Sequence, residues 1–248
     1  MTAAVLTRFF NSEKRVMHAF DQVIKLGDKV TWRIMYSKGT DNTEEVLDGL
    51  LERWDVPNNL TVHVTKTPRI NAQEAICRLF EEATEDELYI FDDDNWLVPN
   101  RVKLQNEICP YHRGICAVRT VGIRNGGPWN YYPMNTEGMD VIIDAGAMRL
   151  RSEYAKKRLV PATRKAMVTD IGPGLYEDRF WTALAIKDGE LCVHPYPLHY
   201  YQFRDDGQMA VLGWEKQRAL FHATSLKIVE ALQGRLTEEE THQVLSAE

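Results

Sequence analysis

The chain has 248 residues, of which 44% are hydrophobic and 27% are charged, values typical of a globular protein and not of a disordered one. Its net charge of −6 argues against a protein whose whole surface binds nucleic acid. No apolar run approaches the roughly 20 residues that span a bilayer, and Arg8 interrupts the N-terminus too early for a signal peptide. We therefore expect a cytoplasmic protein with no integral membrane association.

The first half of the chain alternates between strand-like and helix-like segments. Runs of apolar and β-branched residues indicate the strands, and apolar residues three and four positions apart indicate the helices. Gly27 is a stop signal, whereas Asp41 and Asn71 each precede a glutamate by three residues, as helix caps do. In chain order we expect a strand at 3–7, a helix at 16–24, a strand at 30–36, a helix at 46–54, a strand at 60–64, a helix at 72–83 and a strand at 88–91.

This alternation predicts a largely parallel sheet with right-handed crossovers. Ligands of such sheets bind beyond the carboxyl ends of the strands. The last of these strands ends at that edge in Asp92, Asp93 and Asp94. Three adjacent carboxylates repel one another, and a divalent cation would neutralise them. The triplet therefore indicates a metal–diphosphate site, and the alternative is a solvated acidic turn.

The second half is less regular. Strands are expected at 115–121 and 141–144, with an aromatic, turn-rich loop at 126–133 between them. Helices are expected at 180–185, from 214 to 232, and again from 237. The sequence shows neither an internal repeat nor a linker, so we expect a single domain. Seven basic residues crowd into one stretch, for which a solvated helix face is the expected role: Arg149, Arg151, Lys156, Lys157, Arg158, Arg164 and Lys165.

The four cysteines have irregular spacing, which does not suggest a disulfide framework. Cys109, His112 and Cys116 are close enough in sequence to share a zinc ion. A fourth ligand at a suitable spacing is missing, so the sequence does not favour structural zinc.

The ordered set of segments resembles the GT-A nucleotide-sugar glycosyltransferases, most of all those of family 2. The resemblance runs from Ala3 to Arg204 and rests on the strand and turn at 34–43, the helix and strand at 71–94, the small-residue segment at 144–151, the pair Glu177-Asp178, and His199. The segment 36–38 departs from the pattern, because it replaces the acidic pair and first glycine that usually contact the base. The resemblance leaves the nucleotide undetermined.

The resemblance implies an α/β fold of GT-A type, a single domain with a mostly parallel central sheet flanked by helices and a Rossmann-like N-terminal half. Residues 1–100 would bind the nucleotide sugar, residues 101–205 would bind the acceptor and carry catalysis, and residues 206–248 would form C-terminal helices. It also implies a metal-dependent transfer of a sugar from a nucleotide diphosphate to an acceptor hydroxyl, with inversion.

The resemblance assigns roles to individual residues. Asp178 would be the general base and Glu177 would orient it or the acceptor. Asp94, Asp92 and His199 would hold Mn²⁺ or Mg²⁺, whereas Asp93 should point to the opposite face of the extended segment. The nucleotide sugar would be bound by Thr7, Arg8, Phe9, Tyr36, Ser37, Asp41, Arg69, Asp92 and Asp93, and the acceptor by Trp129, Ala145, Gly146 and Trp181.

Each assignment has a structural alternative. Tyr36 could stack on a base or be a buried strand residue, and Glu177 and Asp178 could be acids favoured at a helix N-terminus. Trp129, with its aromatic neighbours Tyr131 and Tyr132, could stack on a sugar or pack in the fold. The acceptor could be a glycan, a small molecule or a hydroxymethylated base of viral DNA. The chain could also be nucleotidyltransferase-like, or a sugar-nucleotide binder without catalysis.

Overall fold

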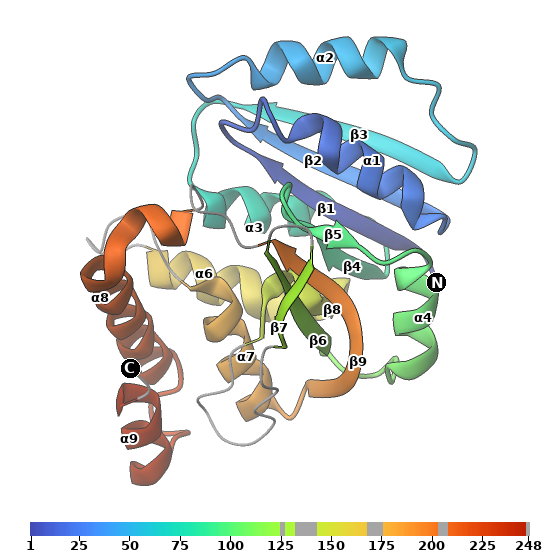
Figure 1. Ribbon diagram of the computed structural model, residues 1–248. Helices are drawn as coiled ribbons and strands as arrows, with labels where there is room; N and C mark the ends of the chain where they lie inside the picture. The colour runs from blue at the N-terminus through green and yellow to red at the C-terminus, as the bar shows by residue number, and fades with distance from the viewer. Residues whose placement is uncertain (125–126, 132–142, 168–175, 203–207, 247–248) are drawn as a thin grey trace.

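The structure is a computed structural model that describes residues 1–124, 127–131, 143–167, 176–202 and 208–246 (Figure 1). Its strands are β1 Ala3–Phe9, β2 Val30–Ser37, β3 Leu60–Thr67, β4 Glu87–Ile90, β5 Trp96–Leu97, β6 Ile115–Arg124, β7 Gly127–Tyr131, β8 Met148–Arg151 and β9 Leu191–Gln202. Its helices are α1 Val16–Leu26, α2 Thr43–Arg53, α3 Ala72–Glu82, α4 Arg101–Ile108, η1 Ala145–Ala147, α5 Ser152–Tyr154, η2 Ala155–Leu159, α6 Val160–Met167, α7 Glu177–Asp188, α8 Gln208–Ala231 and α9 Glu238–Ser246.

One sheet runs through both halves of the described chain, in the order β3-β2-β1-β4-β8-β6-β9-β5, with β7 paired to β6. β3, β2, β1 and β4 are parallel, as the alternation of strands and helices predicts. β8 runs antiparallel between β4 and β6, and β6 and β9 form a long parallel ladder. The fold is therefore a single α/β domain with a mostly parallel sheet and a Rossmann-like N-terminal half, as expected.

Each face of the sheet has its own apolar core. Helices α1 and α2 cover one face, where Phe20, Trp32 and Leu47 are buried. Helices α3, α6 and α7 cover the other face, around Phe80, Phe180 and Trp181. Alternation along the strands divides their residues between the two cores. This division also decides toward which face each side chain at the carboxyl edge points.

Local signals in the sequence fix several helix ends. The Asn71 side chain accepts a hydrogen bond from the Glu74 N–H at 2.7 Å, which caps α3. Gly27 ends α1 in the left-handed conformation. Thr237 and Glu240 exchange side-chain-to-backbone hydrogen bonds before α9, the capping box that the sequence predicts.

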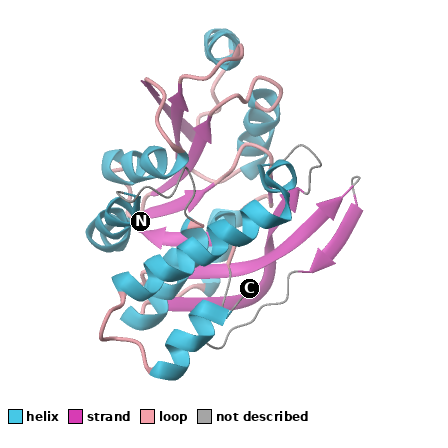
Figure 2. Cartoon of the chain, turned by 90° about the vertical axis from the view of Figure 1, so that its left-hand side faces the viewer, coloured by secondary structure: helices cyan, strands magenta, loops and turns pink. Residues whose placement is uncertain are grey.

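The C-terminal helices form an outer layer over α6 and α7, as Figure 2 shows from the side. Arg179 of α7 is fully buried and holds both of these helices. Its guanidinium donates to Ser225 Oγ of α8 at 2.7 Å and to the Val244 carbonyl of α9 at 3.0 Å, and it lies 3.7 Å from the centre of the Phe221 ring. A single buried cation thus links three helices.

Some predicted elements are wrong. A strand was expected at 141–144, of which residues 141 and 142 lie outside the described part of the chain. Asp144 is not in a strand and instead directly precedes the turn η1. Residues 127–131 of the expected aromatic loop form β7, because β6 extends to Arg124 and pairs with them. Asn42, not Asp41, is the residue that precedes α2. Asp41 instead accepts hydrogen bonds from the backbone N–H groups of Glu13 and Thr43.

Cys109 and Cys116 form a disulfide, with their Cα atoms 6.0 Å apart, which the cysteine spacing did not predict. Cys109 ends α4 and Cys116 begins β6, so the short turn between them brings the sulfur atoms together. His112 is exposed on that turn.

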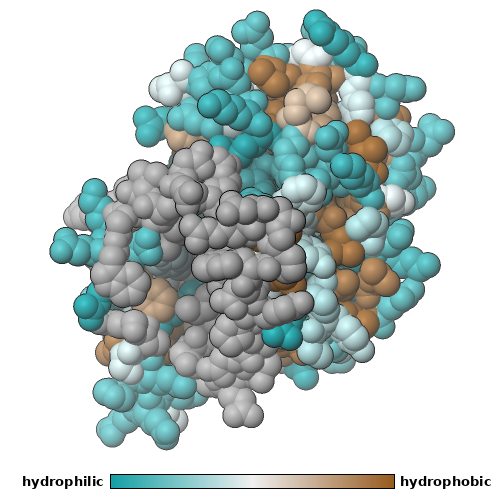
Figure 3. All heavy atoms as spheres, in the orientation of Figure 1, coloured by the Kyte–Doolittle hydropathy of each residue, from teal (hydrophilic) through white to brown (hydrophobic). Residues whose placement is uncertain are grey.

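On the face shown in Figure 3, most described surface atoms are hydrophilic, and the apolar atoms form separate groups. Within the described ranges, we find no helix that combines the length and the apolar character needed to cross a membrane.

Candidate active site

The candidate site lies at the carboxyl edge of the parallel strands, where β1 and β4 end side by side (Figure 1). Thr7 and Phe9 of β1 point into the core beneath α1. The Thr7 hydroxyl accepts a hydrogen bond from the Trp32 indole at 2.9 Å, and Phe9 is fully buried. Arg8 points the other way, toward α3 and α7. Of the three β1 residues expected to bind nucleotide, Arg8 is therefore the one that reaches the other acids of the site.

Arg8 joins two acidic segments that the sequence separates widely. Its guanidinium contacts Asp92 Oδ1 at 2.9 Å and Glu177 Oε1 at 2.6 Å. The other oxygen of Glu177 accepts a hydrogen bond from Gln73 Nε2 at 3.0 Å. Because both of its oxygens are bound, Glu177 is held in one place, which suits a positioning residue.

The aspartate triplet divides between the two faces, as the alternation of an extended segment predicts. Asp92 faces Arg8, whereas Asp93 pairs with Arg15, the residue before α1, at 3.0 Å. Burial raises the pKa of Asp92, and the nearby Asp144 and Glu177 add to this, although Arg8 opposes them. Asp94 lies in the following turn and is half-buried. Its role as a metal ligand stays a prediction.

Asp178 is the most perturbed acid of the site. Its carboxylate accepts a hydrogen bond from the Arg179 N–H at 2.7 Å. Burial, together with repulsion from Asp144, Glu177 and Asp92, raises its pKa to about 8. A helix N-terminus by itself would lower this pKa. A raised pKa is of the kind that functional acids and bases show. The general-base role of Asp178 stays a prediction beside the helix-terminus alternative.

Asp144 and His199 form a second part of the site. His199 on β9 is fully buried, and its Nε2 lies 3.0 Å from Asp144 Oδ1. The two atoms are within ion-pair distance but are not aligned for a hydrogen bond, so neither ring nitrogen has a hydrogen-bond partner among the described residues. Burial would raise the pKa of Asp144, but His199 and the Gly146 N–H lower it overall. The pair thus presents an ionised carboxylate beside an imidazole.

Gly146 makes this arrangement possible. A Cβ atom there would lie 2.5 Å from Cε1 and 2.7 Å from Nε2 of His199. Arg101, which is also buried, donates a hydrogen bond to the Gly146 carbonyl. The small-residue segment at 144–147 therefore leaves room for His199 to reach Asp144.

These residues have the chemistry of a divalent-cation site. Asp144 and Glu177 are close enough to raise the pKa values of Asp92 and Asp178, and Arg8 pairs with Asp92 and Glu177. Carboxylate oxygens and an imidazole are ligands that Mn²⁺ accepts, and His199 places its buried imidazole 3.0 Å from the Asp144 carboxylate. Asp92, Asp144 and His199 are candidate ligands, but the ligand atoms of these three described residues do not all lie within 4.8 Å of one another. The metal-binding role of Asp92 and His199 stays a prediction.

The remaining residues that were expected to bind the nucleotide sugar either line the adjoining loops or hold them in place. Tyr36 is 2% exposed and packs in the core, the structural alternative that the sequence left open. Ser37 Oγ exchanges hydrogen bonds with the backbone of Ile70, and Asp41 ties the loops after β1 and β2 together. Arg69 is exposed, with its guanidinium 5.5 Å from the centre of the Phe10 ring.

The residues expected at the acceptor are placed differently. Ala145 and Gly146 lie at the site, next to Asp144. Trp181 is fully buried against Phe80, and its indole donates to Thr163 Oγ1 at 2.8 Å, so it is a core residue. Trp129 lies on β7, and its side chain, like residue 132, is outside the described part of the structure.

Sequence reasoning missed Asp144 and Gln73 as site residues. Gln73 follows the Asn71 cap on α3, and only its contact with Glu177 marks it. Asp144 was read as part of a strand, but an aspartate directly before Ala-Gly-Ala is also a signal for a turn that its side chain caps. The structure shows this turn, with Asp144 Oδ1 accepting from the Gly146 N–H at 2.7 Å.

Comparison with solved structures places the fold among nucleotide-sugar glycosyltransferases. A crystal structure of S. aureus TarS residues 1–349 in complex with UDP-GlcNAc has a TM-score of 0.70 and 15% identity, covering 99% of this chain and 71% of that chain. The mannosyltransferase PcManGT from Pyrobaculum calidifontis, in complex with GDP-Man and Mn²⁺, has a TM-score of 0.66 and 13% identity, and the match covers 99% of this chain and 68% of that chain. The chain has a GT-A-like glycosyltransferase fold.

At 13–15% identity, this likeness concerns the GT-A-like fold alone. A longer S. aureus TarS chain matches with a TM-score of 0.66, but only 42% of it is covered. No protein-family profile and no curated protein sequence matches the chain. The arrangement of this chain's own residues must therefore carry any statement about its chemistry.

Proposed function

We propose that the protein is a metal-dependent glycosyltransferase that moves a sugar from a nucleotide diphosphate to an acceptor hydroxyl. The observation that carries this proposal is the ion-paired arrangement of Asp92, Arg8 and Glu177 at the carboxyl edge of a GT-A-like sheet, beside Asp178, whose pKa is raised to about 8. A general base works best when its pKa is near the working pH. The neighbours of similar fold bind UDP-GlcNAc in one case and GDP-Man in another, which supports a nucleotide-sugar donor.

Asp178 would take the proton from the acceptor hydroxyl as that oxygen attacks the anomeric carbon. Its carboxylate is held at the start of α7 by a hydrogen bond from the Arg179 N–H. Glu177, held by Arg8 and Gln73, would orient the acceptor. A base on the acceptor side and a leaving diphosphate on the donor side imply a single displacement with inversion.

Asp92, Asp144 and His199 would hold the cation, with Asp94 beside them. When bound, a divalent cation neutralises charge on the departing diphosphate. Mn²⁺ in the PcManGT complex supports this choice of ion. Arg8 then has a second role, since its guanidinium opposes the rise that burial causes in the pKa of Asp92.

The described basic stretch gives no support to DNA as the acceptor. Arg149 is buried against Glu87, Arg158 pairs with Asp188, and Arg164 pairs with Glu74 and Glu81. Arg151 and Lys157 pair with Glu153. These cations are neutralised within the chain, so we propose a glycan or small-molecule acceptor.

Replacement of Asp178 tests the proposal. Asp178→Asn keeps the shape of the side chain but removes its basicity, so we expect transfer, or hydrolysis of the donor by water, to fall by about 10²–10⁴-fold. Binding of the donor, measured by calorimetry, should change by less than about threefold, since Asp178 faces the acceptor. Undiminished turnover in the variant would remove Asp178 as the base.

A further inference from the structure

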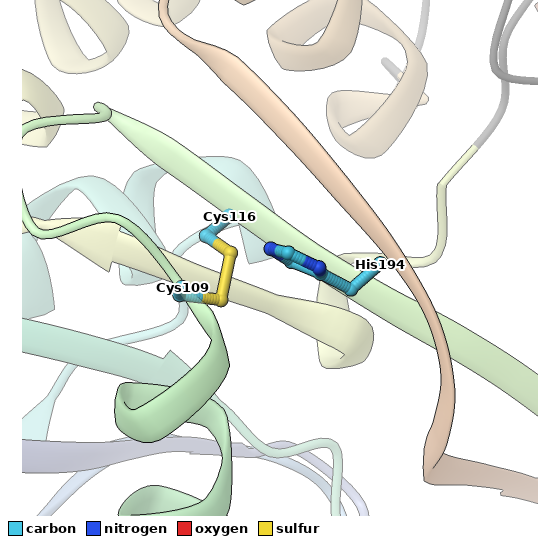
Figure 4. Close-up of side chains that lie close together, drawn as sticks. All are labelled: Cys109, Cys116 and His194. Atoms are coloured by element: carbon cyan, nitrogen blue, oxygen red, sulfur yellow. A yellow bond between two sulfur atoms is a disulfide. The ribbon is translucent and has the colours of Figure 1, made fainter.

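The structure contains a second cluster of side chains that the proposed transfer does not use. It lies where β6 and β9 begin, at the opposite edge of the sheet from the candidate active site. Cys109, Cys116 and His194 each place a ligand atom there, and these atoms all lie within 4.8 Å of one another. Figure 4 shows the His194 ring directed from β9 toward the two sulfur atoms.

Cys192 adds a third thiol to this cluster. It is the ladder partner of Cys116, and its Sγ lies 3.4 Å from His194 Nε2. Cys192 and His194 are two positions apart on β9, so their side chains lie on the same face of the strand. The cluster therefore has two sulfur atoms and one imidazole within 4.8 Å of one another, with the Cys192 sulfur beside the imidazole. These residues come from the end of α4, from β6 and from β9.

We propose that the reduced chain binds a soft divalent cation, Zn²⁺ in particular, through Cys109, Cys116, Cys192 and His194. Three thiolates and an imidazole are a donor set that zinc prefers, in tetrahedral geometry. Metal–ligand distances of about 2.0–2.3 Å separate the ligand atoms by about 3.5–3.8 Å. The ligand atoms of Cys109, Cys116 and His194 lie within 4.8 Å of one another, so shifts of about 1 Å would bring them to this geometry.

A disulfide alone does not account for this donor set. The Cys109–Cys116 bond closes a loop with a sequence separation of 7, and so short a loop stabilises the fold less than a longer one would. It also needs neither the imidazole nor the third thiol. A cation would join β9 to α4 and β6, and β9 carries His199 at its other end. The site would thereby brace the strand that enters the active site.

Metal binding requires the thiols to be free, as they are in a reducing compartment. Reduction breaks the Cys109–Cys116 bond. A phosphine reductant supplies the two electrons and becomes the phosphine oxide, and water supplies its oxygen and the two protons. The cation then displaces the thiol protons into solvent.

Cobalt titration of the reduced full-length chain tests the site. Co²⁺ should give the intense visible absorption of a tetrahedral thiolate site. This absorption should saturate at one equivalent of thiolate-bound Co²⁺ per chain, apart from any Co²⁺ at the acidic edge, and should disappear when Zn²⁺ displaces the ion. Loss of an outer-shell partner typically costs 10–100-fold in metal affinity. Cys192→Ser and His194→Ala, which remove ligands, should therefore weaken binding by more than about 100-fold.

Two control variants keep the titration specific. His112→Ala removes a neighbouring histidine that is exposed, and Cys77→Ser removes a buried cysteine elsewhere, so both should bind Co²⁺ as the unaltered chain does. A second measurement avoids substitution altogether: Zn²⁺ should slow alkylation of Cys109, Cys116 and Cys192 at least tenfold, as mapped by mass spectrometry. Absence of the tetrahedral absorption, or equal alkylation with and without Zn²⁺, would overturn the proposal.

Discussion

Asp178 combines two opposing influences at one carboxylate. It lies in the first turn of α7, where the helix dipole favours the ionised form. Burial and three neighbouring acids favour the protonated form and prevail, since its pKa is raised to about 8. The same residue therefore affects both the pH dependence of activity and the pH dependence of stability.

The activity should depend on Asp178 being ionised. The pKa of Asp178 in the metal-free chain is about 8, so at low Mn²⁺ concentration, where most of the enzyme is metal-free, kcat/KM should rise with pH along an acid limb centred near that value. A bound cation beside Asp92 and Asp144 lowers the pKa of Asp178, so raising the Mn²⁺ concentration should move the limb to lower pH. An acid limb that neither lies near pH 8 nor responds to Mn²⁺ would contradict this assignment.

The stability of the metal-free chain should fall as pH rises because of the same group. The pKa of Asp178 is raised from 3.8 to about 8, so the folded chain binds more protons than the unfolded chain between these values. Asp178→Asn cannot lose a proton and should melt about 2–4 °C higher than the unaltered chain at pH 8. Scanning calorimetry should find this difference vanishing near pH 4; a difference independent of pH would contradict the prediction.

Gly146 tests the close approach of His199 to Asp144. Gly146→Ala places a methyl group 2.5 Å from His199 Cε1, so we expect a loss of about 1–3 kcal/mol in the free energy of unfolding, together with weaker Mn²⁺ binding. Gly49→Ala is the matched control, because nothing lies within 4 Å of its added Cβ inside α2. That substitution should stabilise the chain by up to about 1 kcal/mol. Equal effects of the two substitutions in urea denaturation would refute the steric explanation.

At the level of elements, the first half could be predicted because local pattern and tertiary position agree. The strands before α2 and α3 are short apolar runs, and Asn71 caps α3 as the sequence indicates. The second half depends on longer-range pairing. β9 includes Pro195 and Pro197, and its residues are mostly half-buried, so it has no apolar alternation to detect. Its pairing with β6, through two register shifts, is what makes it a strand.

Arg179 links α7 to the C-terminal helices, and its removal should loosen them. Arg179→Ala leaves Ser225 Oγ and the Val244 carbonyl without their donor and creates a cavity beside Phe221. We expect a loss of about 2–4 kcal/mol in the free energy of unfolding. Arg235→Ala, which breaks the more exposed ion pair with Asp188, should cost no more than about 1 kcal/mol. Similar losses in urea denaturation would show that Arg179 has no special role.

At the level of the whole molecule, the site is assembled from segments that the sheet brings to one edge. Arg8, Asp92, Glu177 and Asp178 were all predicted as site residues, and the structure brings these four together. Asp144 was missed because its position depends on the path of the chain through η1 toward β8. Tyr36 and Trp181 were assigned to ligands because aromatic type alone does not reveal burial.

A single GT-A-like sheet thus carries an acidic edge, where we propose that a cation and a nucleotide sugar bind, and a cysteine–histidine cluster at its other edge. The two sites are joined by β6 and β9, so a cation at the cluster would stiffen the strands that hold His199. The central claim, however, concerns the acidic edge.

Thermal unfolding with UDP-sugars and GDP-sugars, in the presence and absence of Mn²⁺, tests that claim most directly. A ligand that binds the folded chain raises its stability by RT ln(1 + [L]/Kd), about 2.7 kcal/mol at a hundred times Kd. We predict that at least one nucleotide sugar raises the melting temperature only when Mn²⁺ is present, and that Asp92→Asn removes this rise. An unchanged melting temperature with every donor, with and without metal, would contradict the account.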